Sequence, residues 1–109
     1  MRWYRELYTG PHAGENIQRI RKKASAGRWM AGVYYITPAS VPGNLLDIFH
    51  NGMLAQPLFS ETQCMDVIGV AQGRMEALRL AEQILWELYQ KTGGFDIRSY
   101  FQSEDFVED

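Results

Sequence analysis

The turn over residues 69–74 holds residue types that can bind an anion. It joins an apolar segment to a long helical pattern, and Gly73 and Arg74 stand at the start of that helix. Unpaired backbone N–H groups at a helix N-terminus attract negative charge, and Arg74 adds a cation. The turn lacks the Lys and Ser/Thr of a P-loop and the three glycines of a dinucleotide fingerprint. Glu76 competes for the same positive helix end, so an ordinary tight turn is the alternative interpretation.

A second turn, over residues 10–14, offers the same chemistry. Gly10 and Gly14 flank His12, and a basic helical segment follows. Histidine is a titratable residue type, so this turn is also a candidate for ligand or anion binding. The alternative interpretation is an exposed loop histidine with no ligand.

The remaining reactive side chains have no catalytic context. Cys64 is the single cysteine, which excludes an intrachain disulfide and a cysteine zinc site, and we interpret it as a small buried thiol. His50 lies near the end of a short predicted helix, where a positive charge is favourable. No nucleophile motif or metal-ligand spacing is present, so we predict no catalytic residue, no cofactor and no metal, and the sequence disfavours an enzyme.

Charge is divided unevenly along the chain. Residues 1–36 contain seven Lys and Arg against two Glu, and residues 37–109 contain four against eleven acids, although the total net charge is only −2. A basic patch of five residues lies within residues 15–28: Arg19, Arg21, Lys22, Lys23 and Arg28. The patch could bind the phosphate backbone of a nucleic acid, and Trp29 is nearby in the sequence. A solvated basic helix face is the interpretation we favour, and the acidic remainder of the chain disfavours nucleic acid.

The length and composition indicate one globular domain. The chain has 109 residues, of which 46% are hydrophobic and 22% charged. It has no long apolar run, and its start lacks the apolar stretch of a signal peptide. We therefore expect a cytoplasmic protein without a membrane partner. The domain is expected over residues 1–102, with a frayed acidic tail over 103–109.

Strand and helix patterns alternate along the chain. The strands are expected over residues 2–8, 29–37 and 64–71, and the last two are apolar on both faces, which is typical of central strands. The helices are expected over residues 14–26, 44–52 and 74–92, and a partly packed loop with a possible edge strand over 53–63. The order predicts an α/β fold with a small, mostly parallel sheet of three or four strands and three helices. The alternative is a two-layer α+β fold with a mixed sheet.

Trp86 is predicted to project from the outer face of the last helix. The core-facing stripe of that helix contains Ala77, Ala81, Ile84, Leu85 and Leu88, and Trp86 lies nearly opposite, close to Met75. An exposed tryptophan typically packs under another segment or forms an interface. Residues 95–101 follow the helix directly and are the nearest candidate to cover the indole. If Trp86 forms an interface instead, we expect Met75, Phe95 and Tyr100 to belong to it.

Several segments resemble a small uncharacterised bacterial protein family. The similarity covers most of the chain and rests on YI at 35–36, PxNLLDI at 42–48, VIGVA at 67–71, EAL at 76–78 and TGGFDIRxY at 92–100. The resemblance implies a bacterial, single-domain, cytosolic protein and brings no activity or catalytic residue with it.

The leading functional hypothesis is a non-enzymatic interaction or regulatory domain that acts as a homodimer, or that binds an unknown protein partner, through Trp86 and open sheet edges. A small-ligand or anion-binding protein that uses the two turns is the first alternative. Nucleic-acid binding through the basic helix is the second.

Overall fold

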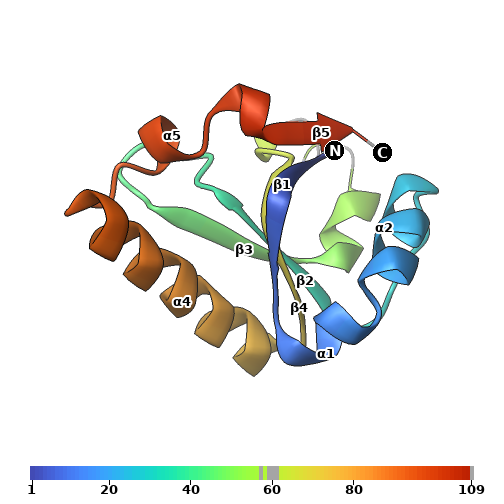
Figure 1. Cartoon of the computed structure of the whole chain (residues 1–109). Helices are drawn as coiled ribbons and strands as arrows, with labels where there is room; N and C mark the ends of the chain where they lie inside the picture. The colour runs from blue at the N-terminus through green and yellow to red at the C-terminus, as the bar shows by residue number, and fades with distance from the viewer. Residues whose placement is uncertain (57, 59–61, 109) are drawn as a thin grey trace.

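A computed structural model describes residues 1–56, 58 and 62–108. Their strands form one five-stranded mixed sheet in the order β3-β2-β4-β1-β5 (Figure 1). The strands are β1 (Arg2–Thr9), β2 (Val33–Pro38), β3 (Leu46–His50), β4 (Asp66–Gln72) and β5 (Phe106–Glu108). Only β1 and β4 pair in parallel, and the other three described pairings are antiparallel.

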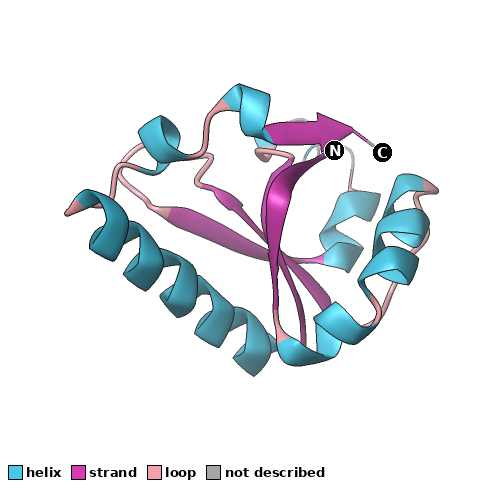
Figure 2. Ribbon diagram, in the orientation of Figure 1, coloured by secondary structure: helices cyan, strands magenta, loops and turns pink. Residues whose placement is uncertain are grey.

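The helices are divided between the two faces of the sheet, as Figures 1 and 2 show. They are α1 (Pro11–Glu15), α2 (Ile17–Ser25), α4 (Arg74–Thr92) and α5 (Ile97–Tyr100), with 3-10 turns η1 (Asn51–Ala55) and η2 (Ser103–Asp105). One apolar cluster joins α1, α2 and η1 to the sheet, and a second joins α4 and α5 to its other face. Each face of the central strands is therefore covered.

Strand β4 lies in the middle of the sheet, as its sequence predicts. Val67 and Val70 belong to the cluster beneath α2, while Ile68 and Ala71 belong to the cluster beneath α4. A Cβ at Gly69 would lie 3.2 Å from Leu80 Cδ2, so this glycine lets α4 approach the sheet closely.

Helix α4 matches the predicted bounds of 74–92. Its buried stripe consists of Ala77, Leu80, Ala81, Ile84 and Leu88, at the spacing of a helix face. Gly93 ends the helix in the left-handed conformation (φ +76°), and its N–H donates to the carbonyl of Tyr89 at 2.7 Å.

The predicted mostly parallel sheet is wrong, and the mixed sheet of the alternative fits the structure. One cause is the segment 44–52, which is expected as a helix because Asn44 resembles an N-cap and Asn51-Gly52 a stop. It forms β3 instead, pairing with β2 over five residue pairs. The alternation of side chains between the two faces of the sheet is hard to recognise in this short apolar run. Leu46 and Ile48 pack toward α4, and Phe49 packs toward the other face.

The C-terminal residues 103–108 form η2 and β5, in place of the expected frayed tail. Strand β5 pairs antiparallel with β1, and Phe106 is buried. Arg2 contributes to this arrangement, because its guanidinium donates to the backbone carbonyl of Ser103 at 3.1 Å and lies over the ring of Phe106. The same guanidinium forms a bidentate ion pair with Asp66.

Two further expectations change in detail. The predicted helix over 14–26 is two helices, α1 and α2, which meet at Asn16. The predicted strand over 29–37 begins only at Val33, because Gly32 adopts a positive φ of 75° and ends a turn before it. Residues 57 and 59–61, in the predicted loop and possible edge strand over 53–63, lie outside the described residues.

Candidate functional site

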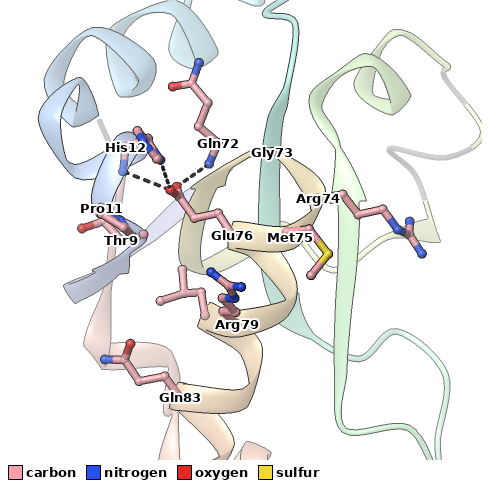
Figure 3. Close-up of a pocket in the computed structure, with 12 residues that line it drawn as sticks. Thr9, Pro11, His12, Gln72, Gly73, Arg74, Met75, Glu76, Arg79 and Gln83 are labelled. Atoms are coloured by element: carbon pink, nitrogen blue, oxygen red, sulfur yellow. Dashed lines mark hydrogen bonds and ion pairs between the residues drawn. The ribbon is translucent and has the colours of Figure 1, made fainter.

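The fold brings the two glycine-bearing turns together in one cleft of about 490 Å³ (Figure 3). Strands β1 and β4 are parallel neighbours, so their carboxyl ends lie at the same edge of the sheet. The chain leaves β1 for α1 on one face and leaves β4 for α4 on the other. A crevice between parallel strands whose connections diverge in this way is a common ligand position in α/β proteins.

Four of the five predicted ligand-binding residues line this cleft: Gly10, His12, Gly73 and Arg74. The fifth, Gly14, is not among the lining residues. Gly14 lies against Thr9 instead: a Cβ built on Gly14 would be 3.0 Å from the Thr9 hydroxyl. In Figure 3 the side chain of Arg74 extends away from His12.

A carboxylate of the protein itself occupies the centre of the cleft. The side chain of Glu76 is only 8% exposed and accepts backbone N–H groups from Gln72 at 2.7 Å, His12 at 3.0 Å and Ala13 at 3.2 Å. Its Oε1 also lies 2.8 Å from Nδ1 of His12 (Figure 3). Glu76 therefore joins the start of α4 to the first turn of α1.

Ionisation of Glu76 reflects two opposing effects. Burial favours the neutral acid, but the N–H donors of Gln72, His12 and Ala13 and the ring of His12 favour the carboxylate, and together they lower the pKa of Glu76. The backbone donors that an external anion would use at this position are thus already paired. The predicted anion site remains a prediction, and such an anion would have to displace Glu76.

Gly10 is needed for this arrangement. A Cβ built on Gly10 would overlap the side chain of Glu76, which passes directly beneath the turn. The sequence names Glu76 only as a competitor for the helix end, and the proximity of Gly10 to Glu76 has no signal in the local pattern.

His12 is the group in the cleft that is best placed for proton chemistry. Its ring is 74% exposed, and Nδ1 faces the Glu76 carboxylate. When Nδ1 carries the proton that is shared with Glu76, Nε2 is left as an acceptor, which is the orientation that a carboxylate imposes on a general base. This is the geometry that general-base chemistry requires of a histidine.

The outer surface of α4 is the second candidate site. It consists of Met75, Arg79, Glu82 and Trp86, which follow one another along the solvent side of the helix. Met75 and Trp86 are each 61% exposed, so the predicted exposure of Trp86 is confirmed. The side chains of Arg79 and Glu82 form no ion pair or hydrogen bond with the described residues.

The residues predicted to accompany Trp86 lie in different environments. Phe95 is exposed, stacks on Tyr89 with ring centroids 5.3 Å apart, and lines the same shallow groove as Trp86. Tyr100 is partly buried against the core and meets Phe101 edge-to-face. The segment 95–101 therefore does not cover the indole of Trp86.

The basic patch lies on α2 and the turn after it. Arg19, Lys22 and Arg28 are exposed and Lys23 is partly exposed, whereas Arg21 lies over the ring of Trp3 at 5.2 Å and belongs to the packing of the domain. The sequence places Trp29 inside a covered strand, yet it is 65% exposed in the turn before β2. Gly27 and Gly32 lie on either side of that turn, and both have a positive φ. These two glycines were the sequence signal that could have predicted a turn here.

Cys64 and His50 have structural contacts. Cys64 precedes β4 and is only partly buried, and its N–H donates to the hydroxyl of Ser40 at 2.8 Å. His50 is the last residue of β3, not the end of a helix, and its ring meets Tyr34 edge-to-face. Within the described part of the chain, no three His, Cys, Asp or Glu side chains are grouped to hold a metal ion.

Comparison of the chain with protein-family models, curated proteins and solved structures finds no match. The resemblance to a small bacterial family therefore stays a prediction. None of the described helices has the length and apolar character needed to cross a membrane.

Proposed function

We propose that the protein is an interaction domain that acts as a homodimer through the outer surface of α4. The observation that carries this proposal is the order of side chains on that surface. Met75, Arg79, Glu82 and Trp86 are separated by four, three and four residues, which is the spacing of a seam between two packed helices. The seam begins and ends with a large exposed apolar side chain and has opposite charges at its centre.

This order is self-complementary when two copies of α4 pack antiparallel. Met75 then faces Trp86 of the partner subunit, and Arg79 faces Glu82 of the partner subunit. Both pairs share a midpoint between residues 80 and 81, so one twofold axis satisfies them together, as an isologous dimer requires. Arg79 and Glu82 lack partners among the described residues. The antiparallel pairing places a side chain of opposite charge against each of them.

Neighbouring apolar side chains extend the seam on one side. Leu78 and Tyr89 are exposed on the same flank of α4, and Leu45 and Phe95 continue the apolar surface beyond the helix. Contiguous exposed apolar surface of this kind is typical of protein–protein contacts. The charged centre supplies orientation, because a parallel pair would place Arg79 against its own copy.

Sedimentation velocity at micromolar concentration tests the dimer. The wild type is expected to sediment as a dimer, and Trp86→Ala to dissociate at least about thirtyfold more easily, because a tryptophan that acts as an interface hot spot contributes about 2 kcal/mol or more. Trp29→Ala is the matched control, since it removes an equally exposed indole elsewhere and should leave the dimer intact. A monomeric wild type ends the proposal.

Charge reversal tests the antiparallel pairing. Arg79→Glu and Glu82→Arg each place like charges opposite one another, so each variant alone should dimerise at least about tenfold more weakly. A mixture of the two variants should form a heterodimer, and the double variant should recover the wild-type affinity. Failure of the mixture to associate would exclude this orientation.

A second candidate function is small-molecule binding in the cleft, favoured by the pairing of His12 with Glu76 at the diverging ends of β1 and β4. A thermal-shift screen against nucleotides and phosphorylated metabolites tests it, since a bound ligand raises the melting temperature. His12→Ala should abolish the shift. A screen without any shift argues against this function.

A further inference from the structure

We propose that the surface formed by Arg19, Lys23 and Trp29, with Arg28 next to Trp29 in the sequence, binds single-stranded nucleic acid. This site is independent of the proposed dimer contact, because α2 and α4 cover opposite faces of the sheet (Figure 1). The two proposals can therefore fail separately.

The position of Trp29 is the first reason. The indole is 65% exposed, more than any other aromatic side chain among the described residues, and it is held at the surface by local contacts. Its ring lies edge-on to His50, with centroids 6.4 Å apart, and a Cβ at Gly52 would lie 3.0 Å from its Nε1. An exposed and supported aromatic ring is the platform on which an unpaired base stacks.

The cations around the indole are the second reason. Arg19, Lys23 and Trp29 line one small hollow of about 180 Å³, and no carboxylate is among its lining residues. The side chains of Arg19, Lys23 and Arg28 form no ion pair or hydrogen bond with the described residues. Their charge is thus available to a phosphate backbone, and it lies in the half of the chain that carries the excess of Lys and Arg.

The shape of the site favours a single strand. The hollow beside Trp29 is small, and a base reaches an indole face only when it is unstacked from its own neighbours. A membrane surface would require an apolar helix face next to the cations. The apolar side chains of α2 face the sheet instead: Ile20 is buried, and Ile17 and Ala24 pack against the same cluster.

Fluorescence anisotropy with a labelled short oligothymidine tests the proposal on the full chain. Binding is expected at low salt and should weaken as salt rises, with a slope of log K against log salt of about −0.7 for each phosphate contacted. Trp29→Ala should weaken binding at least about fivefold, which is the lower end of base stacking, while Trp29→Phe retains most of the affinity.

Charge variants separate phosphate contact from general attraction. Lys23→Glu should weaken binding and make the salt slope shallower, because one phosphate contact is lost. Lys91→Glu removes an exposed cation from α4, on the other face of the sheet, and should change the affinity little. No binding at low salt overturns the proposal, as does wild-type affinity in both Trp29→Ala and Lys23→Glu.

Two competitors define the ligand class. A duplex of the same length should compete more weakly than the single strand, and vesicles rich in phosphatidylserine should not compete through Trp29. Equal competition by duplex, or vesicle binding that depends on Trp29 and Lys23, would overturn the assignment to single-stranded nucleic acid.

Discussion

Replacing Glu76 with glutamine tests whether the buried carboxylate holds the two turns of the cleft together. Glu76 accepts three backbone N–H groups and faces the ring of His12. The amide of glutamine retains a single oxygen and turns an NH₂ group toward at least one of these donors. A hydrogen bond to a charged group contributes about 1.5–3 kcal/mol, so losing one or two costs about 3 kcal/mol. In a domain of this size, that lowers the melting temperature by roughly 15 °C.

The effect should depend on pH in a defined direction. Because the pKa of Glu76 is lowered in the folded protein, its carboxylate contributes full stability above the ordinary value of 4.5. That contribution is lost as the pH falls through the lowered folded value. The difference in unfolding free energy between the wild type and Glu76→Gln should therefore be largest near neutral pH and shrink in acid.

Urea unfolding at neutral pH and at about pH 3 measures both effects. Glu15→Gln is the matched control, because Glu15 is an exposed carboxylate of α1 without a hydrogen-bond partner among the described residues. Its substitution should change stability by less than about 0.5 kcal/mol. The reasoning is refuted if Glu76→Gln is as stable as the wild type at neutral pH, or if the difference does not decline in acid.

Three further substitutions test other parts of the fold by the same unfolding measurement. Gly10→Ala should cost about 1–3 kcal/mol, because its methyl group overlaps Glu76; Gly10→Ala combined with Glu76→Ala should cost less than the sum of the two. Asn51→Ala should cost about 2–4 kcal/mol, since the buried amide donates to the hydroxyl of Tyr35 at 2.8 Å, and Tyr35→Phe should cost less. Phe106→Ala should cost about 3 kcal/mol if β5 is part of the core, whereas a frayed tail would tolerate it.

Elements with strong local signals were predictable. Helix α4 has the length, the apolar period and the terminal glycine that define a helix without reference to the rest of the chain. Strand β4 is apolar on both faces, and this pattern alone predicts a covered central strand. The outward direction of Trp86 follows from the same helical period, because the angle between residues on one helix needs no tertiary information.

Elements that depend on distant partners were not predictable. Residues 44–52 have local helix signals, but pairing with β2 and packing of Leu46 and Ile48 against α4 outweigh them. The acidic C-terminus resembles a loose tail until Arg2 and β1 are placed beside it. Trp29 is a different case, because its apparent place in a strand by alternation was wrong although a local signal, Gly32 with its positive φ, lies close by in the sequence.

The candidate site also has one part that the sequence predicted and one part that it did not. The sequence identified both glycine turns and placed Glu76 at the start of α4, since these are features of neighbouring residues. Only the tertiary structure brought the carboxylate of Glu76 within hydrogen-bond distance of the first turn of α1, across more than sixty positions of chain. Residue types and periods specify which way a side chain leaves its own helix or strand. Which other segment it meets depends on the parallel pairing of β1 with β4, and no local pattern encodes that pairing.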